Sequence, residues 1–342
     1  MNLKHLKVPW RVTFDTNPDD CNLHCIMCEQ HSDYHRDYTE KENNSKKEQM
    51  PLEFIKSVLD EISNKGLKEI VPSTMGEPLL YQKFDKILDY CHHYNLKLNL
   101  TTNGTFPRLG AKIWAQKIIP VASDIKISWN GATASTQEAI MKGTRFSKNL
   151  QNLKDFIQVR DEIVNEIGTS CSITLQMTFM DKNLAEIPEL IILAVKLGIE
   201  RIKGHHLWVH FPEIQPLSLR EPEKAEGWNL MVKKAHQMVD KYRLKTGRKI
   251  KLENFKFLNL DYPKIPDGLC PFLGQEAWIS ATGRFDPCCA PDTQRRKLGF
   301  FGNISEKNFT SIWNSDKYKS LLTSYLSYPL CQQCLMRQPT EK

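Results

Sequence analysis

Strand-like and helix-like segments alternate through the first two thirds of the chain, and this alternation constrains the fold most. Pro188 and Gly198 mark the beginning and end of one helical segment. In others, apolar residues fall on one helical face: Ile55, Val58, Leu59 and Ile62, and then Phe84, Ile87, Leu88 and Cys91. Extended runs lie between the helical segments, at residues 10–16, 67–73, 96–103, 124–130, 171–178 and 201–207. Strands separated by helices form parallel βα units, so the pattern predicts six such repeats.

The expected strands carry polar residues at every second position. Ile125, Ile127 and Trp129, for example, interleave with Lys126, Ser128 and Asn130. Parallel strands that are buried on both faces usually read as continuous apolar runs. The alternative is an antiparallel sheet with one solvent-exposed face, but the intervening helices disfavour it. We expect an α/β fold, a partial and open (β/α)6 barrel whose lumen is lined by polar groups.

The composition is that of an ordinary globular protein, with 40% hydrophobic and 25% charged residues in 342. No apolar stretch approaches the roughly 18 residues of a membrane span, and the N-terminus lacks an export signal. The net charge of +7 is spread along the chain without a basic stripe. We expect a cytoplasmic protein with no membrane or nucleic-acid partner.

Changes in composition along the chain predict its domains. Residues 30–50 contain almost no apolar side chains, which is typical of a mobile loop. Residues 220–247 have the pattern of a long helix, and after about Tyr262 the sequence turns to Gly, Pro, Cys and aromatic residues. The predicted segments are a barrel over 1–220, a linking helix and strand over 221–261, and a small cysteine-rich domain over 262–342.

Three of the ten cysteines, Cys21, Cys25 and Cys28, lie within eight residues directly after the first expected strand. In a chain without an export signal, cysteines point to metal binding or catalysis before disulfides. Three thiolates can hold a four-iron cluster and leave one iron open. Thiolates also suit zinc, but a structural zinc ion takes four ligands, and His24 would have to supply the fourth from between two cysteines.

The spacing of Cys21, Cys25 and Cys28 resembles the CxxxCxxC signature of the radical S-adenosylmethionine (SAM) superfamily. The segment 75–78, Met-Gly-Glu-Pro, is similar to the family's GGEP-type motif, with methionine where glycine is common, and 101–104 resembles its TNG-type segment. The resemblance implies that residues after several strands contact SAM, where barrel enzymes place their sites: Gly76, Glu77, Pro78, Asn103, Ser128, Asn130 and Gln176.

The resemblance also implies a mechanism. The amino and carboxylate groups of SAM bind the open iron, and an electron from the reduced cluster cleaves the carbon–sulfur bond. The 5′-deoxyadenosyl radical then abstracts a hydrogen atom from an unactivated carbon, while the protein orients the reactants. A small electron-transfer protein, such as a flavodoxin or ferredoxin, is the implied electron donor.

A second cysteine group lies near the C-terminus. Residues 278–289 have the pattern of a hairpin that turns at Gly283 and ends at Cys288 and Cys289. Together with segments 302–304 and 311–313, this region resembles the SPASM and twitch extensions of the superfamily. The spacing is similar to that of a twitch domain with one auxiliary 4Fe–4S cluster, which implies four ligands: Cys270, Cys288, Cys331 and Cys334. The spacing favours Cys288 over Cys289, and a zinc ribbon is the alternative.

Other reactive side chains have simpler interpretations. Cys91 and Cys171 fall on apolar faces and are expected in the core. Cys289 is a candidate hydrogen-atom donor to a product radical. Three histidines follow the sixth expected strand and are candidates to face substrate, although a lone histidine is more often structural: His205, His206 and His210.

Three functions are consistent with these features. The first is oxidation or epimerisation of a small sugar-like or aminocyclitol-like metabolite, because the single-cluster spacing resembles that of aminocyclitol dehydrogenases. The second is modification of a ribosomally made peptide, which the 20 residues before Cys21 disfavour because many such enzymes carry an N-terminal recognition domain. A zinc-stapled binding protein would leave segments 75–78 and 101–104 unexplained. We expect a radical SAM oxidoreductase or epimerase.

Overall fold

The computed structural model describes residues 3–35, 47–72, 75–258, 268–334 and 336–337, so part of the predicted mobile loop at 30–50 lies outside the described residues. The chain divides into two compact units. Unit 1 consists of Met1–Asp19, Lys47–Leu98 and Lys264–Lys342, and unit 2 consists of Asp20–Lys46 and Asn99–Pro263. This grouping joins the two ends of the chain in one unit. The predicted boundaries at 220 and 261 describe the order of segments along the chain and stay a prediction.

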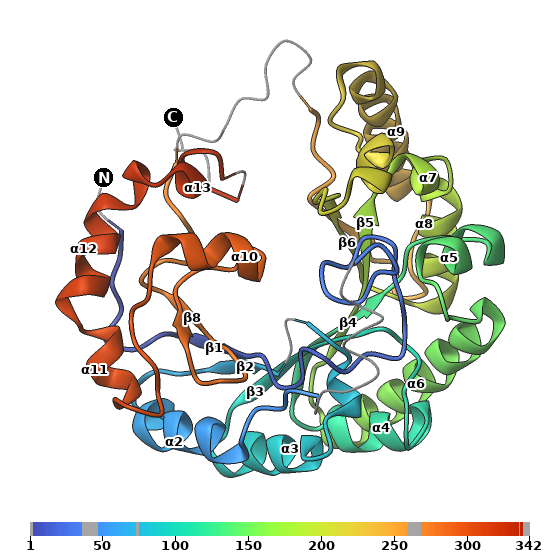
Figure 1. Ribbon diagram of the computed structural model, residues 1–342. Coiled ribbons are helices and arrows are strands. Elements are labelled where there is room, and N and C mark those ends of the chain that lie inside the picture. The colour runs from blue at the N-terminus through green and yellow to red at the C-terminus, as the bar shows by residue number, and fades with distance from the viewer. Residues whose placement is uncertain (1–2, 36–46, 73–74, 259–267, 335, 338–342) are drawn as a thin grey trace. The chain divides into compact units, whose positions relative to one another are not determined.

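Figure 1 labels the elements. The strands are β1 (Arg11–Phe14), β2 (Glu69–Val71), β3 (Lys97–Thr102), β4 (Ala122–Ser128), β5 (Ser172–Phe179), β6 (Arg201–His206), β7 (Lys251–Glu253), β8 (Glu276–Ile279) and β9 (Phe285–Asp286). The helices are α2 (Leu52–Ile62), α3 (Phe84–His93), α4 (Ala111–Ile118), α5 (Ala134–Ile140), α6 (Phe146–Ile167), α7 (Asp181–Leu184), α8 (Ile187–Leu197), α9 (Pro222–Lys241), α10 (Asp292–Arg295), α11 (Phe309–Trp313), α12 (Asp316–Ser324) and α13 (Pro329–Gln332). No helix among the described residues is long and apolar enough to span a bilayer.

The strands form an open sheet in the order β7-β6-β5-β4-β3-β2-β1-β8-β9, so the α/β prediction of a partial, open parallel barrel is confirmed. The six predicted strands correspond to β1 to β6. A seventh strand, β7, lies within the segment 221–261, for which a linking helix and strand are predicted; it has only three residues and pairs in parallel with β6. The predicted hairpin is present, with Trp278 opposite Asp286, and Gly283 adopts φ +86° in its turn. Its first strand, β8, also pairs in parallel with β1.

Unit 1 packs helices against the apolar face of its strands. The predicted apolar positions of α2 and α3 are all buried, including Cys91. Glu61 of α2 accepts hydrogen bonds from the backbone amides of Phe309 and Thr310 at 2.9 and 2.8 Å. These are amides at the start of α11, which otherwise lack partners within their helix. Glu61 therefore ties the C-terminal segment to α2.

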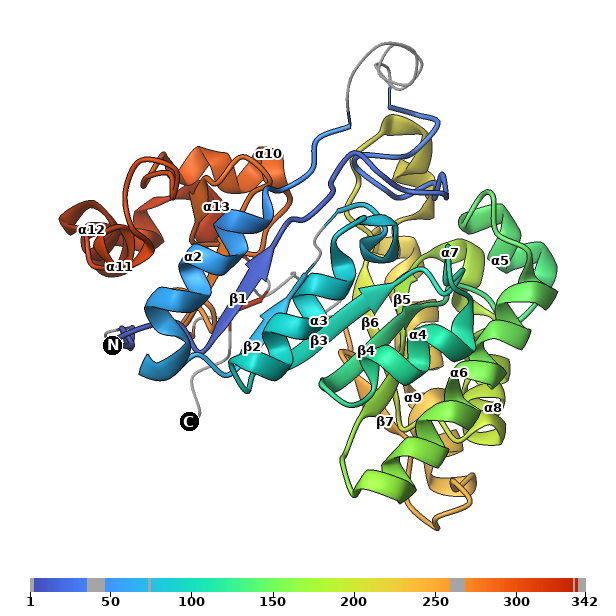
Figure 2. The same ribbon diagram turned by 90° about the horizontal axis from the view of Figure 1, so that it is seen from below.

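Unit 2 places α4, α6 and α8 on the apolar face of β4 to β6 (Figure 2). Helix α8 has Pro188 in its first turn and ends at Gly198 in a left-handed conformation, as predicted. Cys171 is buried, as predicted. A Cβ atom at Gly204 of β6 would lie 1.9 Å from Cζ of Phe179, so this strand position must be glycine for the Phe179 ring to pack across it.

Candidate functional site

The loop that carries Cys21, Cys25 and Cys28 belongs to unit 2 and is held by the segment that follows α5. The backbone amides of His24 and Ile26 donate to the carbonyl oxygens of Lys142 and Ile140 at 2.9 and 3.0 Å. The loop also buries two of its own side chains in an apolar cluster, which consists of Leu23, Ile26, Ile140, Met141, Met180, Leu207 and Ile214. Backbone pairing and apolar burial together fix the path of the loop on either side of its thiols.

The three thiols lie half-buried and close enough to interact electrostatically. Burial, followed by the neighbouring thiols Cys28 and Cys21, raises the pKa of Cys25 well above its ordinary value. Burial also raises the pKa of Cys28, whose Sγ accepts a hydrogen bond from the His31 amide at 3.3 Å. Repelling, desolvated thiolates are stabilised by bound iron, so this donor set fits an iron–sulfur cluster. The described residues contain no group of three or more His, Cys, Asp or Glu side chains arranged to hold a single metal ion.

Asn103, a predicted SAM contact, ties the TNG-like segment to the cysteine loop. Its Nδ2 donates to Asn22 Oδ1 at 2.8 Å and lies 3.9 Å from Cys21 Sγ. Its Oδ1 accepts hydrogen bonds from the amide and hydroxyl of Thr105 at 3.0 and 2.7 Å. No local pattern indicates this support of Cys21, because the residues involved are about eighty positions apart.

The other predicted SAM contacts of unit 2 fall into two environments. Ser128 of β4 pairs in register with Gln176 of β5, which pairs with Lys203 of β6, so these three half-buried residues form one row on the polar face. Asn130 is only 1% exposed, and its Oδ1 accepts a hydrogen bond from the Thr178 amide at 2.8 Å. The structure therefore uses Asn130 to close the loop after β4.

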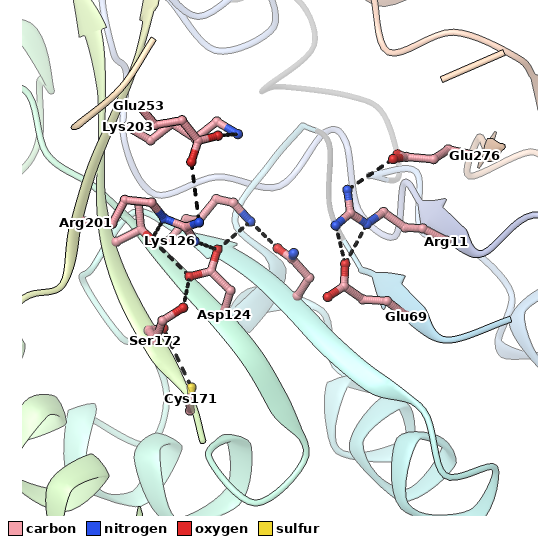
Figure 3. A network of polar contacts seen from close by, with 12 residues as sticks. Arg11, Glu69, Asp124, Lys126, Cys171, Ser172, Arg201, Lys203, Glu253 and Glu276 are labelled. Atoms are coloured by element: carbon pink, nitrogen blue, oxygen red, sulfur yellow. Dashed lines mark hydrogen bonds and ion pairs between the residues drawn. The ribbon is translucent and has the colours of Figure 1, made fainter. Parts of the chain in front are cut away.

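The polar face of β4 to β7 carries a network of ion pairs (Figure 3). Asp124 lies 2.5 Å from Arg201 Nη2 and 3.2 Å from Lys126 Nζ, and the network continues to Glu253, which lies 2.9 Å from Lys203 Nζ. Burial alone would raise the pKa of Asp124, but Lys126 and its other partners outweigh that effect and lower it. The predicted polar lining is thus present in unit 2, and much of its charge is paired within the protein.

Two of the three candidate histidines lie at the end of β6 and have strongly lowered pKa values. Burial, with the nearby Lys203, lowers the pKa of His205 to about 4. Burial, with Arg220, lowers the pKa of His206 to about 4, and the ring of His206 packs on Phe179 and Trp228. His205 and His206 are therefore neutral at pH 7. Burial also lowers the pKa of His210, and the negative charge of Glu29 partly offsets this lowering.

The GGEP-like segment belongs to unit 1. Gly76 has φ +72°, a conformation that glycine adopts easily. Glu77 is 1% exposed and its Oε1 accepts a hydrogen bond from the Leu79 amide at 3.2 Å, capping the short turn Pro78–Leu80, where Pro78 is buried. The Glu77 carbonyl accepts a hydrogen bond from Asn17 Nδ2 at 2.8 Å, which joins the loops after β1 and β2.

The second cysteine group also lies in unit 1, where three separate segments bring it together. Cys331 is buried and interacts electrostatically with the other three predicted ligands, Cys288, Cys270 and Cys334. The Sγ atom of Cys288 accepts a hydrogen bond from the Ala290 amide at 3.4 Å. Cys289 is exposed and donates a hydrogen bond to Cys288, which lowers the pKa of Cys288. Four buried or half-buried thiols that interact electrostatically fit the donor set of a fully ligated cluster.

Family models match most of this architecture. Residues 18–194, more than half of the chain, match the radical SAM superfamily, and residues 270–335 match the SPASM iron–sulfur cluster-binding domain. The chain therefore belongs to the radical SAM superfamily. Within it, the chain is a member with a C-terminal SPASM domain, which implies a SAM-binding 4Fe–4S cluster and an auxiliary iron–sulfur cluster.

Individual relatives are distant. The chain is 23% identical to the tungsten-containing aldehyde ferredoxin oxidoreductase cofactor-modifying protein of Pyrococcus furiosus, over 93% of this chain and 85% of that protein. It is 24% identical to the SAM-dependent nucleotide dehydratase of Selenomonas ruminantium, over 54% of this chain and only 61% of that protein. The Streptococcus suis SuiB structure bound to its precursor peptide SuiA has a TM-score of 0.68 and 16% identity, covering 97% of this chain and 71% of SuiB. This likeness shows the fold.

Proposed function

We propose that this chain is an enzyme that abstracts a hydrogen atom from an unactivated carbon of a small polar metabolite, of sugar or aminocyclitol type, and completes its oxidation or epimerisation. The observation that carries the proposal is the half-buried, mutually interacting thiol group Cys21, Cys25 and Cys28 on a loop fixed at both sides. When bound there, a 4Fe–4S cluster and SAM supply a 5′-deoxyadenosyl radical by reductive cleavage, with the electron coming from a flavodoxin or ferredoxin.

The chain's own residues hold and orient these groups. The three thiolates of the loop are the proposed cluster ligands, and Asn103 holds the loop through Asn22. Glu77 and Gly76 are the proposed contacts for the amino group of SAM, on the strength of the motif alone. Cys289 is exposed, as a hydrogen-atom donor to a radical must be, and we keep it as the candidate donor for epimerisation.

The polar face of unit 2 supports the proposed substrate class. Ser128, Gln176 and Lys203 lie in one half-buried row, and the neutral His205 stands two residues beyond Lys203 on β6. A row of hydroxyl, amide and ammonium groups with an imidazole beyond it is suited to a molecule with several hydroxyl or amino groups. The nucleotide named for the Selenomonas relative is also a small molecule, which supports this class over a peptide.

Oxidation needs an acceptor for a second electron. After loss of a hydrogen atom, the substrate radical must release one electron and one proton to become the oxidised product. The four thiolates Cys270, Cys288, Cys331 and Cys334 would hold an auxiliary cluster, which would supply an acceptor for this electron. Epimerisation needs no electron acceptor but needs a hydrogen-atom donor on the opposite face of the carbon. The Cys289 thiol would give that hydrogen atom, and one electron from the flavodoxin or ferredoxin with one proton from solvent would restore the resulting thiyl radical to the thiol.

Iron analysis tests the cluster assignment. We expect about eight irons per chain after anaerobic reconstitution and about four in the Cys21→Ala/Cys25→Ala/Cys28→Ala variant, which must also lose all 5′-deoxyadenosine formation. Cys171→Ala, which removes a buried thiol outside both groups, is the control and should keep about eight. Zinc in place of iron, or unchanged iron in the triple variant, would return the chain to a zinc-stapled binding protein.

Substrate-dependent SAM cleavage tests the substrate class. Sugars, aminocyclitols and nucleotides should be compared with peptides for their ability to stimulate 5′-deoxyadenosine formation. Deuterium transfer from a labelled carbon into 5′-deoxyadenosine identifies the site of abstraction. Stimulation and deuterium transfer by a small metabolite support the proposal, and transfer from a peptide alone would favour peptide modification.

A further inference from the structure

A group of charged side chains lies next to Cys288, on β9 and α10 of unit 1. Arg295 lies with its Nε 3.3 Å from Asp286 Oδ2 and its Nη2 3.1 Å from Asp292 Oδ1. Arg284 Nη2 lies 2.7 Å from each of the same two carboxylates. Asp286 precedes Cys288 by two residues, so the group extends to the proposed auxiliary-cluster ligand.

The interior of this group has an excess of positive charge. The side chains of Arg295, Arg284 and Asp286 are only 4, 15 and 1% exposed, which leaves two guanidinium groups for one carboxylate in the interior. Asp292 is 29% exposed and Arg296, which pairs with it at 2.6 Å, is 62% exposed. Solvent screens these outer charges far more than the inner ones.

A buried cation without a full counter-charge is costly, because burial removes its hydration. A 4Fe–4S cluster with four thiolates carries net negative charge and becomes more negative on reduction. The charge of Arg295 lies near the proposed ligand, because its Nε pairs at 3.3 Å with Asp286, which precedes Cys288 by two residues. Arg284 and Arg295 together exceed the buried negative charge of Asp286, and an anionic cluster would balance the remaining positive charge.

We propose that Arg295 is a positioning residue that sets the reduction potential of the auxiliary cluster, its buried charge stabilising the reduced state and so making the cluster a better acceptor of the substrate's second electron. The inference rests on the proposed auxiliary cluster. Arg295 also fixes α10 beside the ligand loop through Asp286 and Asp292. Its charge is permanent at any working pH, so the effect involves no proton.

The test uses the full chain in the Cys21→Ala/Cys25→Ala/Cys28→Ala background, where the auxiliary cluster is the one remaining cluster. A redox titration followed by electron paramagnetic resonance measures its midpoint potential. Arg295→Gln should lower the ratio of reduced to oxidised cluster at a fixed potential about tenfold, which is about 59 mV for one electron. Arg295→Lys keeps the positive charge, so its midpoint potential should stay close to that of the background protein.

Two further variants separate electrostatics from folding. Arg296→Gln removes the same charge from the next residue in an exposed position and should shift the ratio less than about twofold. Asp286→Asn removes the buried negative charge and should shift the potential in the opposite direction, which keeps the test decisive if Arg295→Gln does not fold. Equal shifts for Arg295→Gln and Arg296→Gln, or an Asp286→Asn shift of the wrong sign, would overturn the inference. Absence of iron in the background protein would instead overturn the auxiliary cluster itself.

Discussion

The two cysteine groups differ in the charges around their thiols. In unit 2, the anion Glu29 acts on Cys28, and the nearby cation Lys142 is paired with Asp33 at 2.8 Å. In unit 1, Arg295 acts on Cys288 more strongly than the opposing anion Asp286, and Arg337 acts on Cys331 and Cys334. Cations stabilise a reduced, more negative cluster, whereas an anion destabilises it.

This contrast gives the proposed clusters different electron affinities. A cluster bound by the first group would be the harder to reduce and the stronger reductant, which suits reductive cleavage of SAM. A cluster bound by the second group would accept an electron more readily, which suits oxidation of a substrate radical. The local charges therefore agree with the roles that we propose, independently of how the two units are placed.

Removing the second group alone should give the largest effect. Cys331→Ala/Cys334→Ala is expected to lose about four irons and to lower oxidised product about 100-fold, while substrate-stimulated SAM cleavage continues. The reason is that the first group keeps its ligands, whereas the second electron loses its acceptor. Iron content, 5′-deoxyadenosine and product are measured together. Full product formation without the second group would mean that the reaction is not an oxidation through that cluster.

Two asparagines, one beside each cysteine group, allow the hydrogen bonds that hold the two groups to be tested separately. Asn103 holds the first cysteine loop, and Asn303 holds the hairpin of the second through Thr282 and Ser305, with bonds of 2.8 to 3.0 Å. Losing the half-buried hydrogen bonds of Asn103 costs about 1–3 kcal/mol locally, and losing the exposed bonds of Asn303 costs less, about 0.5–1.5 kcal/mol. Asn103→Ala should speed iron loss from the first cluster, and Asn303→Ala from the second. Chelator-driven iron release, resolved by the spectra of each cluster, measures this. Faster loss of both clusters in each variant would point to general destabilisation.

Acidification should destabilise unit 2, because two of its histidines have lowered pKa values. His205 and His206 have a pKa of about 4 in the folded chain and about 6.5 when unfolded, so the unfolded chain binds more protons between these values. Their contribution to stability is complete above pH 6.5 and is lost as the pH falls towards 4. Thermal unfolding from pH 7.5 to 4.5 should show a falling midpoint. His206→Phe, which keeps the packing on Phe179 and Trp228, should flatten the fall, and an unchanged slope contradicts the assignment.

The smallest expected effect concerns Arg337. This half-buried residue donates from Nε to the Gly268 carbonyl at 2.7 Å, and solvent screens its charge more than that of Arg295. Arg337→Gln should therefore lower the reduced fraction of the auxiliary cluster only about twofold to threefold at a fixed potential. The same redox titration measures it. A shift larger than that of Arg295→Gln would reverse the order of the two cations.

The sequence indicated local structure well because local structure depends on neighbouring residues. The repeating apolar positions located β1 to β6, α2 and α3, and Pro188 and Gly198 bounded α8. Cysteine spacing led to the superfamily in the same way, since a loop ligand set is a short-range pattern. The three-residue strand β7 is predicted only as an unplaced strand within 221–261, because it is too short to show a period.

Contacts between distant segments could be decided only by the tertiary structure. Nothing in the local sequence shows that β8 pairs with β1, that Asn103 holds Asn22, or that Asp124 pairs with Arg201. Even Arg295, close to Cys288 in sequence, shows its role only once folding has buried it while leaving its neighbour Arg296 in water. Residue identity and spacing thus determined which chemical groups the chain carries. Burial and long-range pairing decided how strongly each one acts, because electrostatic and hydrogen-bond strengths depend on distance and on exclusion of water.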